Sequence, residues 1–304
     1  MGNDNQSLKE WRILQEDYRT NEIHTGTIER MEYTTYSYDE QNIELKKSLN
    51  VYLPKGYDAA NKNVRYNIFY LMHGGGEDES TLFHGPGESS ELKNIIDHMI
   101  EKQEIDPMIL VTPTFYVKEN QDVSFLARNF HQELMNDILP AVESKYNTYA
   151  AGVTLEDLNK SREHRAFGGF SMGAACTWYV FMNCLDYFQY YMPLSGDCWA
   201  IEDKGGLTKP IETAELLGKA VDQTQYKKED YYIFCATGSK DIAYDHLIPQ
   251  IEEMKKLTDY FVYTPNGYDG NFSFYVKPDA THWWHYVYEY VYIGLMFFFK
   301  PYNC

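Results

Sequence analysis

The sequence predicts an α/β fold around a mostly parallel β-sheet with an antiparallel N-terminal start. From about residue 66 onward, short apolar runs alternate with longer segments of helical periodicity. This alternation is typical of βαβ units, whose right-handed crossovers place helices on both faces of a parallel sheet. Before them, residues 25–38 and 43–53 alternate apolar and polar side chains with no helix between them, which predicts two antiparallel strands.

The remaining elements follow from the same two periodicities. Each later strand is a short, uninterrupted apolar run, as expected where both faces of a strand are buried. The predicted strands are 66–72, 108–112, 166–170, 190–194, 231–236 and 272–276. The predicted helices are 91–102, 129–146, 174–185, 244–257 and a terminal helix within 283–299, with a further region around 211–221.

The length and organisation of the chain favour one domain. The 304 residues are enough for a large α/β domain with a buried core. Because no internal repeat or linker interrupts the sequence, we predict a single domain over residues 1–304, with residues 1–20 as a peripheral N-terminal segment. The start of the chain is polar and has no visible signal peptide, which is typical of a sequence whose leader has been removed.

Composition and charge exclude several classes of partner. The net charge of −18 argues against nucleic acid and anionic membranes, because binding to phosphates needs clustered Lys and Arg. The most apolar stretch, residues 283–299, is short for a membrane span and fits a buried helix better. The five cysteines have no metal-binding spacing, and a disulfide such as Cys198–Cys235 stays open. We expect no metal and no cofactor.

The strongest chemical signal is Gly169-Phe170-Ser171-Met172-Gly173. It follows an apolar run and precedes helix-forming residues, which is the strand–turn–helix context of a nucleophile elbow. In such an elbow the serine has a strained backbone, and the N-terminus of the next helix points its N–H groups at a developing oxyanion. We therefore predict Ser171 as a nucleophile and the N–H of Met172 as an oxyanion donor.

A second glycine-rich segment, His73-Gly74-Gly75-Gly76, directly follows the predicted strand 66–72. It matches the loop that supplies the other oxyanion N–H in lipases and esterases. We predict that Gly75 supplies this N–H and that His73 has a structural role. The alternative is a plain glycine turn at the end of a strand.

The base and the acid are predicted from loops at the carboxyl ends of late strands, the edge where open α/β sheets carry their active sites. Asp241 follows strand 231–236, and His282 lies between the last strand and the last helix. The order Ser, Asp, His is that of the α/β-hydrolase fold. The alternatives for the acid are Asp245, Asp269 and Asp279, or a helix-capping role for Asp241. His285 is the alternative for the base.

These three groups form a chemical unit. A serine hydroxyl is a weak nucleophile until a neutral imidazole takes its proton, and a buried carboxylate fixes the imidazole tautomer. Ser171, His282 and Asp241 are therefore the predicted catalytic triad of a serine hydrolase.

The stretch from His73 to the C-terminus resembles the feruloyl-esterase branch of carbohydrate esterase family 1, including the esterase modules attached to clostridial cellulosomal xylanases. The resemblance is carried by five segments, 111–115, 168–173, 192–197, 236–244 and 280–284. It implies hydrolysis of the ester between ferulate or p-coumarate and the arabinose of xylan, without a cofactor. It also implies the same triad and a ferulate pocket lined by Trp199, whose indole can pack on a flat methoxyphenol.

The loop 116–125 is longer than in the bacterial modules of that family. We predict that it folds as a small hairpin over the cleft, with Tyr116 or Phe125 clamping the aromatic acid; the alternative is a surface excursion.

Two other functions stay open from sequence. One is an acetyl-xylan or other short-acyl carbohydrate esterase, and the other is a non-catalytic polysaccharide-binding module, suggested by the aromatic content of 16%. The implied partner is feruloylated arabinoxylan or its oligosaccharides, and secretion is expected from that substrate.

Overall fold

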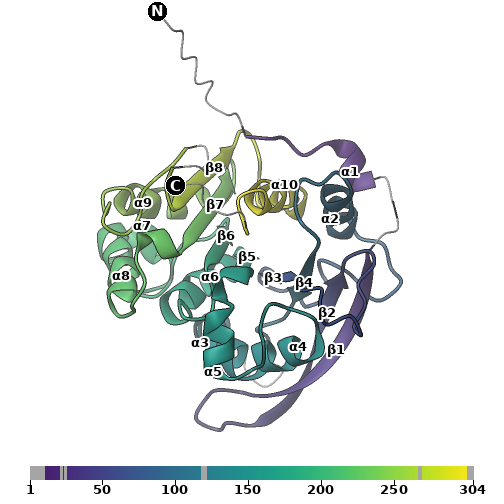
Figure 1. Ribbon diagram of the computed structural model, residues 1–304. Helices are drawn as coiled ribbons and strands as arrows, with labels where there is room; N and C mark the ends of the chain where they lie inside the picture. Colours follow the sequence, from purple (N-terminus) through teal and green to yellow (C-terminus); the bar gives the residue numbers. More distant parts are fainter. Residues whose placement is uncertain (1–10, 21–22, 24–25, 118–121, 266–268, 300–304) are drawn as a thin grey trace, which may run out of the picture.

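All strands in the described part of the chain belong to one sheet. The computed structural model describes residues 11–20, 23, 26–117, 122–265 and 269–299. The sheet has eight strands in the order β1-β2-β4-β3-β5-β6-β7-β8 (Figure 1). They are β1 (Thr27–Tyr36), β2 (Glu44–Leu53), β3 (Asn67–Met72), β4 (Met108–Thr112), β5 (Arg165–Phe170), β6 (Tyr190–Leu194), β7 (Tyr232–Gly238) and β8 (Phe272–Lys277).

The direction of the strands agrees with the prediction. β1 and β2 pair antiparallel from Thr27 opposite Leu53 to Tyr36 opposite Glu44, and β2 pairs antiparallel with β4. Every later pair, from β3–β4 to β7–β8, is parallel. The carboxyl ends of β3, β5, β6, β7 and β8 therefore lie along one edge of the sheet.

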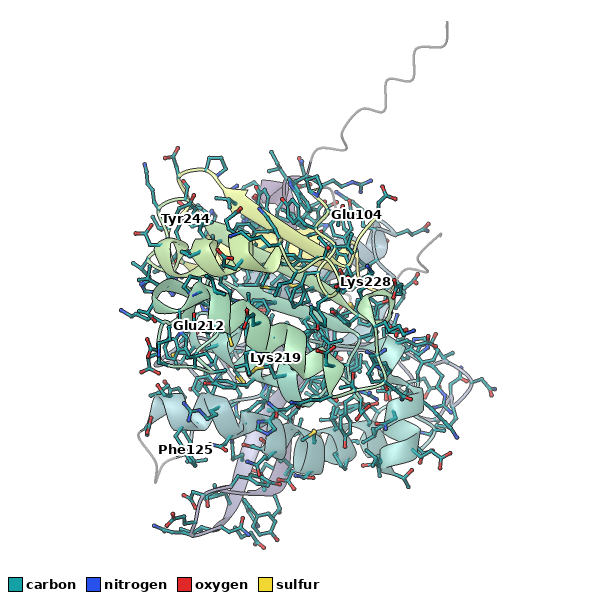
Figure 2. All side chains as sticks on the ribbon, turned by 90° about the vertical axis from the view of Figure 1, so that its left-hand side faces the viewer. Glu104, Phe125, Glu212, Lys219, Lys228 and Tyr244 are labelled. Atoms are coloured by element: carbon teal, nitrogen blue, oxygen red, sulfur yellow. The ribbon has the colours of Figure 1, made fainter. Side chains whose placement is uncertain are left out.

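Helices cover both faces of this sheet, as predicted. One face carries α3, α4, α6, α8 and α9, and the other carries α1, α2 and α10 (Figure 1). Glu212 and Lys219 of α8 and Tyr244 of α9 mark the outer layer of the first face in Figure 2. The helices are α1 (Glu16–Thr20), α2 (Glu91–Glu101), α3 (Val123–Glu133), α4 (Leu139–Lys145), α5 (Leu155–Lys160), α6 (Met172–Asn183), α7 (Gly205–Thr208), α8 (Pro210–Asp222), α9 (Tyr244–Met254) and α10 (Trp284–Leu295).

The central strands divide their side chains between two apolar cores. In β3, Ile68 and Tyr70 enter the core under α3 and α6, while Phe69 and Leu71 enter the core under α2 and α10. All six residues of β3 are buried. This burial on both faces explains why these strands read as continuous apolar runs rather than alternating ones.

The predicted helix 129–146 is three segments instead of one. α3 already begins at Val123, and a π-helical turn, Leu134–Ile138, separates it from α4. The cause is Pro140 near the start of α4, which has no N–H to donate to the carbonyl four residues before it. The backbone N–H of Leu139 bonds instead to the carbonyl of Leu134, five residues back.

The predicted hairpin over 116–125 is wrong for its second half. Asp122 caps the N-terminus of α3, where its carboxylate accepts the Phe125 N–H at 3.1 Å, so Val123 to Phe125 form the first turn of a helix. Residues 118–121 lie outside the described residues. The Phe125 side chain is partly buried against the core between the sheet and α3.

The N-terminal segment is less peripheral than predicted over residues 11–20. Leu14 and Tyr18 are buried in the core beneath α2 and α10. The Trp11 ring lies 5.9 Å from the ring of Phe234 and 5.6 Å from that of Tyr275. This part of the segment therefore contributes to the second core, while residues 1–10 lie outside the described residues.

Candidate active site

Ser171 lies in a strained turn between β5 and α6. Its φ of 57° and ψ of −114° are rare for a residue with a side chain, and such strain costs on the order of 1–3 kcal/mol. The turn is held by the Ser171 N–H, which donates to the Leu194 carbonyl of β6 at 2.9 Å. A Cβ atom on Gly169 would lie 2.4 Å from the Gly173 carbonyl oxygen, so the turn requires a residue without a side chain there.

The structure brings Ser171, His282 and Asp241 into one line of hydrogen bonds. The Oγ of Ser171 lies 2.8 Å from Nε2 of His282, and Nδ1 of His282 lies 2.7 Å from Oδ1 of Asp241. The Asp241 side chain is fully buried, whereas that of His282 is 19% exposed. Three groups that are up to 111 residues apart in sequence thus meet at the carboxyl edge of the sheet.

The line of contacts fixes the direction in which a proton can move. The Asp241 carboxylate accepts, so Nδ1 of His282 carries the hydrogen and Nε2 is left to accept the Ser171 hydroxyl proton. Oδ1 of Asp241 also accepts the N–H of Ala243 at 2.8 Å, which fixes the carboxylate in its loop. The Phe170 ring packs 4.4 Å from the His282 ring and keeps that imidazole over the elbow.

The alternatives considered from sequence lie elsewhere. Asp279 is exposed and pairs with Lys240 at 2.7 Å. His285 lies beside Arg19 and Glu91, with its Nδ1 3.9 Å from the Glu91 carboxylate. Asp245 is in the first turn of α9. Within the described residues, the carboxylate that contacts His282 is that of Asp241.

The loops that carry Asp241 and His282 are joined by their backbones. The Lys240 N–H donates to the Ala280 carbonyl at 3.0 Å, and the Asp279 N–H donates to the Ser239 Oγ at 2.8 Å. A Cβ on Gly238 would lie 2.1 Å from the Ala280 carbonyl oxygen. This contact holds the acid and the imidazole at a fixed separation.

The three glycine N–H groups of the loop after β3 differ in their hydrogen-bond partners. The Gly74 N–H donates to Glu77 Oε2 at 2.7 Å, and the Gly76 N–H donates to the Tyr116 hydroxyl at 2.8 Å. The Gly75 N–H has no hydrogen-bond acceptor within the described ranges, and Gly75 is exposed. It faces the elbow, since a Cβ on Gly75 would lie 3.1 Å from Cγ of Met172.

The N–H of Met172 is the second donor left open. Met172 is the first residue of α6, whose opening N–H groups have no partner inside the helix. In the part of the chain that the structure describes, this N–H has no acceptor. Met172 directly follows Ser171 and Gly75 packs against Met172, so the elbow has two unused N–H groups next to it, the kind of donor that an oxyanion requires.

His73 is a buried structural residue of the same loop, as predicted. Its Nδ1 lies 2.7 Å from the Gly74 carbonyl oxygen and its Nε2 lies 2.7 Å from Oγ1 of Thr114. Burial lowers the pKa of His73 to about 4, so the ring is neutral near pH 7. A neutral ring that donates from Nδ1 and accepts at Nε2 satisfies both contacts.

The family comparison agrees with this arrangement. The family model described as Esterase matches residues 41–290, which includes the elbow, the glycine loop and both later loops.

The chain belongs to the esterase family.

Relatives of this esterase include parts of larger enzymes. It is 45% identical to the endo-1,4-beta-xylanase Y of Acetivibrio thermocellus over 294 residues, which cover 97% of this chain and 25% of that protein. It is 28% identical to an endo-1,4-beta-xylanase/feruloyl esterase of Xylanibacter ruminicola over 187 residues, which cover 60% of this chain and 23% of that protein. The esterase therefore spans about a quarter of the length of these relatives.

Solved structures confirm the predicted α/β-hydrolase fold. A mutant of the feruloyl esterase module from Clostridium thermocellum, complexed with sinapinate, is 43% identical, with a TM-score of 0.80 over 96% of this chain and 94% of that one. A ferulic acid esterase from the anaerobic fungus Anaeromyces mucronatus is 19% identical, with a TM-score of 0.67 over 95% of this chain and 98% of that one. At that identity, the second match shows the shared fold alone.

Trp199, the predicted ferulate contact, lies in the loop after β6, the strand beside the elbow. Its indole N–H donates to Oδ1 of Asp197 at 3.0 Å, and Oδ2 of Asp197 accepts the Gly206 N–H at 2.9 Å. Burial raises the pKa of Asp197. Gly196 packs directly on the elbow, since a Cβ there would lie 2.6 Å from the Ser171 carbonyl oxygen. The half-buried Trp199 is therefore held by its own loop, which packs on the elbow at Gly196.

Tyr116 and Phe125, one or the other of which is predicted to clamp the aromatic acid, lie in different parts of the structure. Tyr116 lies at the glycine loop, where its ring stacks on that of His73 with a centroid distance of 5.7 Å. Phe125 lies at the start of α3 (Figure 2), whose residue Ser124 contacts Asp203 in the loop beyond Trp199. The structure thus gives Tyr116 a contact with the loop itself, which sequence reasoning missed.

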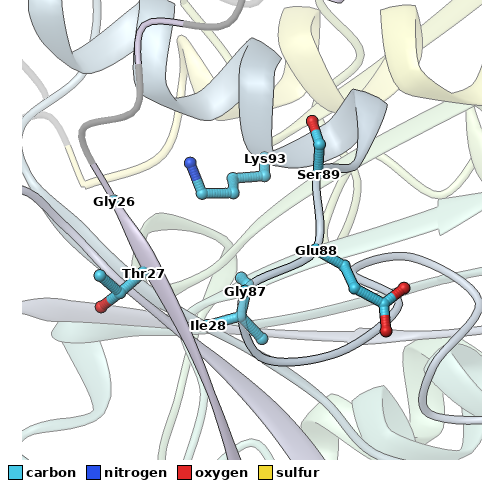
Figure 3. Close-up of a pocket in the computed structure, with 7 residues that line it drawn as sticks. All are labelled: Gly26, Thr27, Ile28, Gly87, Glu88, Ser89 and Lys93. Carbon is cyan, nitrogen blue, oxygen red and sulfur yellow. The ribbon is translucent and has the colours of Figure 1, made fainter.

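The pocket in Figure 3 is separate from this site. It has a volume of about 340 Å³ and lies between the start of β1 and the start of α2. Lys93, whose side chain extends along it, pairs with Asp97 at 2.6 Å. Asp97 also accepts the Gly26 N–H at 2.8 Å. These contacts hold β1 to α2, and none of them involves Ser171.

The four cysteines in the described residues, Cys176, Cys184, Cys198 and Cys235, are free and buried. The disulfide that the sequence left open between Cys198 and Cys235 is therefore not formed. Burial raises the pKa of Cys235 and of Cys198, so their thiols stay protonated and unreactive. The described residues contain no group of three or more metal-binding side chains and no helix long and apolar enough to cross a membrane.

Proposed function

We propose that this chain is a feruloyl esterase that hydrolyses ferulate and p-coumarate esters of arabinoxylan through a Ser-His-Asp acyl-enzyme mechanism. The observation that carries the proposal is the hydrogen-bonded line from Ser171 Oγ through His282 to Asp241. The 43% identity to a protein described as a feruloyl esterase module, over 96% of this chain, supports the choice of acyl group.

In the first step Ser171 Oγ attacks the ester carbonyl carbon while its proton passes to Nε2 of His282. The carbonyl oxygen becomes an oxyanion, which the N–H groups of Gly75 and Met172 stabilise. The C–O bond to the sugar then breaks, and the imidazolium of His282 protonates the departing sugar oxygen. Asp241 stabilises the imidazolium during this step.

In the second step water hydrolyses the acyl-enzyme. His282, now neutral, takes a proton from water, and the resulting hydroxide equivalent attacks the acyl carbon. The same two N–H groups hold the second oxyanion. Cleavage of the bond to Ser171 Oγ then releases the cinnamic acid, and the proton on His282 returns to the serine.

Trp199 is the proposed wall of the acyl pocket. Its indole is anchored by Asp197, so its plane is fixed before a substrate arrives. A fixed aromatic plane favours flat phenolic acyl groups over acetyl, because the stacking contact is lost with the small acid. Trp199→Ala is therefore expected to raise KM for methyl ferulate about 10-fold or more and to leave hydrolysis of a short acetyl ester within about 2-fold.

The test of the function is a substrate panel with a nucleophile control. The wild-type chain is expected to hydrolyse methyl ferulate and methyl p-coumarate faster than acetylated xylan, and Ser171→Ala is expected to lose turnover with its circular dichroism spectrum unchanged. A preference for the acetyl ester would make the chain a short-acyl carbohydrate esterase instead. Failure of a fluorophosphonate to label Ser171 would leave only a binding module.

The proposed natural substrate is feruloylated arabinoxylan or its oligosaccharides. Such a polymer lies outside the cell, so we propose that the chain acts there as a secreted enzyme, as a single catalytic domain. The two relatives named as xylanases support this placement in wall degradation. Release of ferulate from insoluble wheat arabinoxylan by the purified chain, compared with release by Ser171→Ala, is the measurement.

A further inference from the structure

One carboxylate, that of Glu77, contacts both sides of the candidate active site. Its Oε2 accepts the N–H of Gly74 at 2.7 Å, and its Oε1 accepts the indole N–H of Trp284 at 2.7 Å. Gly74 begins the glycine loop that carries the unused Gly75 N–H. Trp284 is the first residue of α10 and follows His282 by two positions.

The two hydrogen bonds of Glu77 are separate from the backbone contacts that hold the loops of Asp241 and His282 together. Glu77 and Trp284 are 207 residues apart in sequence, so their hydrogen bond is a long-range link between separate segments. The Phe170 ring packs on both rings of this segment, 4.4 Å from the His282 ring and 4.7 Å from the Trp284 ring between centroids. The loop, the elbow and the start of α10 thus form one packed unit.

The contact with Gly74 has a direct consequence for the donor at Gly75. The Gly74 N–H and the Gly76 N–H are held by Glu77 and by the Tyr116 hydroxyl, so the peptide groups before and after the one that carries the Gly75 N–H have fixed orientations. Glycine has a broad range of φ and ψ, and three glycines in a row would otherwise sample many arrangements. Fixing the two neighbouring peptide groups restricts the direction of the Gly75 N–H, next to the start of α6.

A carboxylate in this place is not explained by oxyanion stabilisation, because a negative charge opposes a developing negative charge. Its two oxygens instead accept from two N–H donors, which gives charge-assisted hydrogen bonds to both. The chemistry of Glu77 therefore fits the positioning of other groups.

We propose that Glu77 is a positioning residue that holds the oxyanion donor of Gly75 and the segment bearing His282 in one arrangement. The inference rests on the proposed function, since it assumes that Ser171 attacks an ester carbonyl. Glu77 acts through Gly74 and Trp284 and has no contact with the reacting atoms.

The test uses Glu77→Ala, Trp284→Phe and their double mutant in the full chain. Glu77→Ala is expected to lower kcat for methyl ferulate about 10- to 100-fold with KM changed less than about 3-fold, because a small misplacement of the donor affects the transition state. Trp284→Phe removes one of the two contacts and is expected to lower kcat less. The double mutant is expected to resemble Glu77→Ala, because both contacts pass through one carboxylate.

Asp78→Asn is the matched control. Asp78 is the neighbouring acid in the same loop, is exposed, and bonds to the Ser80 N–H instead of to Gly74 or Trp284. It removes the same charge close to the same place and is expected to keep kcat within about 2-fold of wild type. Glu77→Gln, which retains one acceptor oxygen, is expected to lie between wild type and Glu77→Ala.

A transition-state analogue separates positioning from simple loss of structure. An arylboronic acid forms a tetrahedral adduct with an active serine, whereas ferulate binds as a product with no adduct. In Glu77→Ala the Ki of the boronic acid is expected to rise by the same factor as kcat/KM falls, with the Ki of ferulate unchanged.

The inference is overturned if Glu77→Ala keeps wild-type kcat, or if its boronic acid Ki is unchanged while its thermal unfolding midpoint falls. It is also overturned if Asp78→Asn is as damaging as Glu77→Ala. The proposed function fails in a different way, through a wild-type chain that a fluorophosphonate labels at Ser171 but that leaves methyl ferulate intact. In that case slower labelling of Glu77→Ala than of Asp78→Asn would still support the positioning role.

Discussion

The two ends of β5 use polar groups in opposite ways. At its first residue the guanidinium of Arg165 is buried and makes hydrogen bonds with all of its donor nitrogens. It meets Glu143 through Nε at 2.6 Å and through Nη2 at 3.0 Å. Its other contacts are the Leu158 and Tyr187 carbonyls and the Ser161 hydroxyl. Nothing in this network is left for another molecule.

At the other end of β5, six residues further along, the elbow leaves polar groups unused. The N–H groups of Gly75 and Met172 have no acceptor among the described residues, and the backbone of Ser171 is strained. Oδ2 of Asp241 is buried without a hydrogen-bond partner in the described part of the chain. One strand thus has, at its start, buried polar groups that are all hydrogen-bonded and contribute to stability. At its end it has polar groups without partners, which remain available to bind another molecule.

The largest expected effect is a loss of activity at the Ser171 end of β5. Asp241→Asn is expected to lower kcat for methyl ferulate by about 10³- to 10⁴-fold, because an amide no longer fixes the His282 tautomer. The unfolding free energy should change far less than activity. Steady-state kinetics and urea unfolding measure the two. Asp279→Asn, in the adjoining loop, is the control, and equal loss in both variants would contradict the assignment of Asp241.

The next largest expected effect is a loss of stability at the Arg165 end of β5. Arg165→Met leaves the Glu143 carboxylate buried without its cation and is expected to lower the unfolding free energy by about 3–5 kcal/mol. The kcat of the molecules that remain folded should be unchanged, since Arg165 lies at the far end of β5 from Ser171. Adding Glu143→Leu should recover most of the lost stability. If kcat fell instead with stability intact, the separation of the two ends would be wrong.

A smaller effect concerns pH and the buried His73. The unfolded chain binds a proton at this position near pH 6.5, whereas the folded protein does so at about pH 4. The stability present above pH 6.5 is therefore lost as the pH falls to about 4, with a total of about 3 kcal/mol from this group. Urea unfolding across this range should show this loss in wild type and a correspondingly shallower decline in His73→Gln. If the unfolding free energy declined with pH equally in both proteins, the assignment of His73 as neutral and buried would be contradicted.

The smallest effect concerns Tyr290 of α10, whose hydroxyl is buried without a hydrogen-bond partner among the described residues. Removing an unpaired buried hydroxyl is nearly neutral or stabilising, so Tyr290→Phe should change the unfolding free energy by less than about 1 kcal/mol and leave kcat within about 2-fold. Thermal unfolding and kinetics provide the measurement. A clear loss of activity would contradict the assignment of this hydroxyl as unpaired and unused.

The strands and the order of the site residues could be predicted from sequence because burial and position leave local signals. β4 and β6 have the predicted bounds, since strands buried on both faces are continuous apolar runs. Ser171, Asp241 and His282 each follow or adjoin a strand end, where the topology of a parallel sheet brings loops together. Distance in sequence is no obstacle to such an inference.

Other features gave no local signal. The link from Glu77 to Trp284 joins residues whose types do not suggest a pair and that are 207 residues apart in sequence. The start of α3 was missed because residues 116–125 contain few apolar positions with helical spacing, although Asp122 is an ordinary capping residue. The packing of Trp11 on Phe234 depends on a strand more than two hundred residues later.

The donor at position 172 belongs to the peptide group and not to the methionine. Every amino acid except proline would present the same N–H there, while its side chain would stand against Gly75 in place of the thioether. Position 172 can therefore vary in shape without deleting the donor. A saturation library at this codon, proline excepted, would show which side-chain shapes the glycine loop accepts while the N–H stays in place.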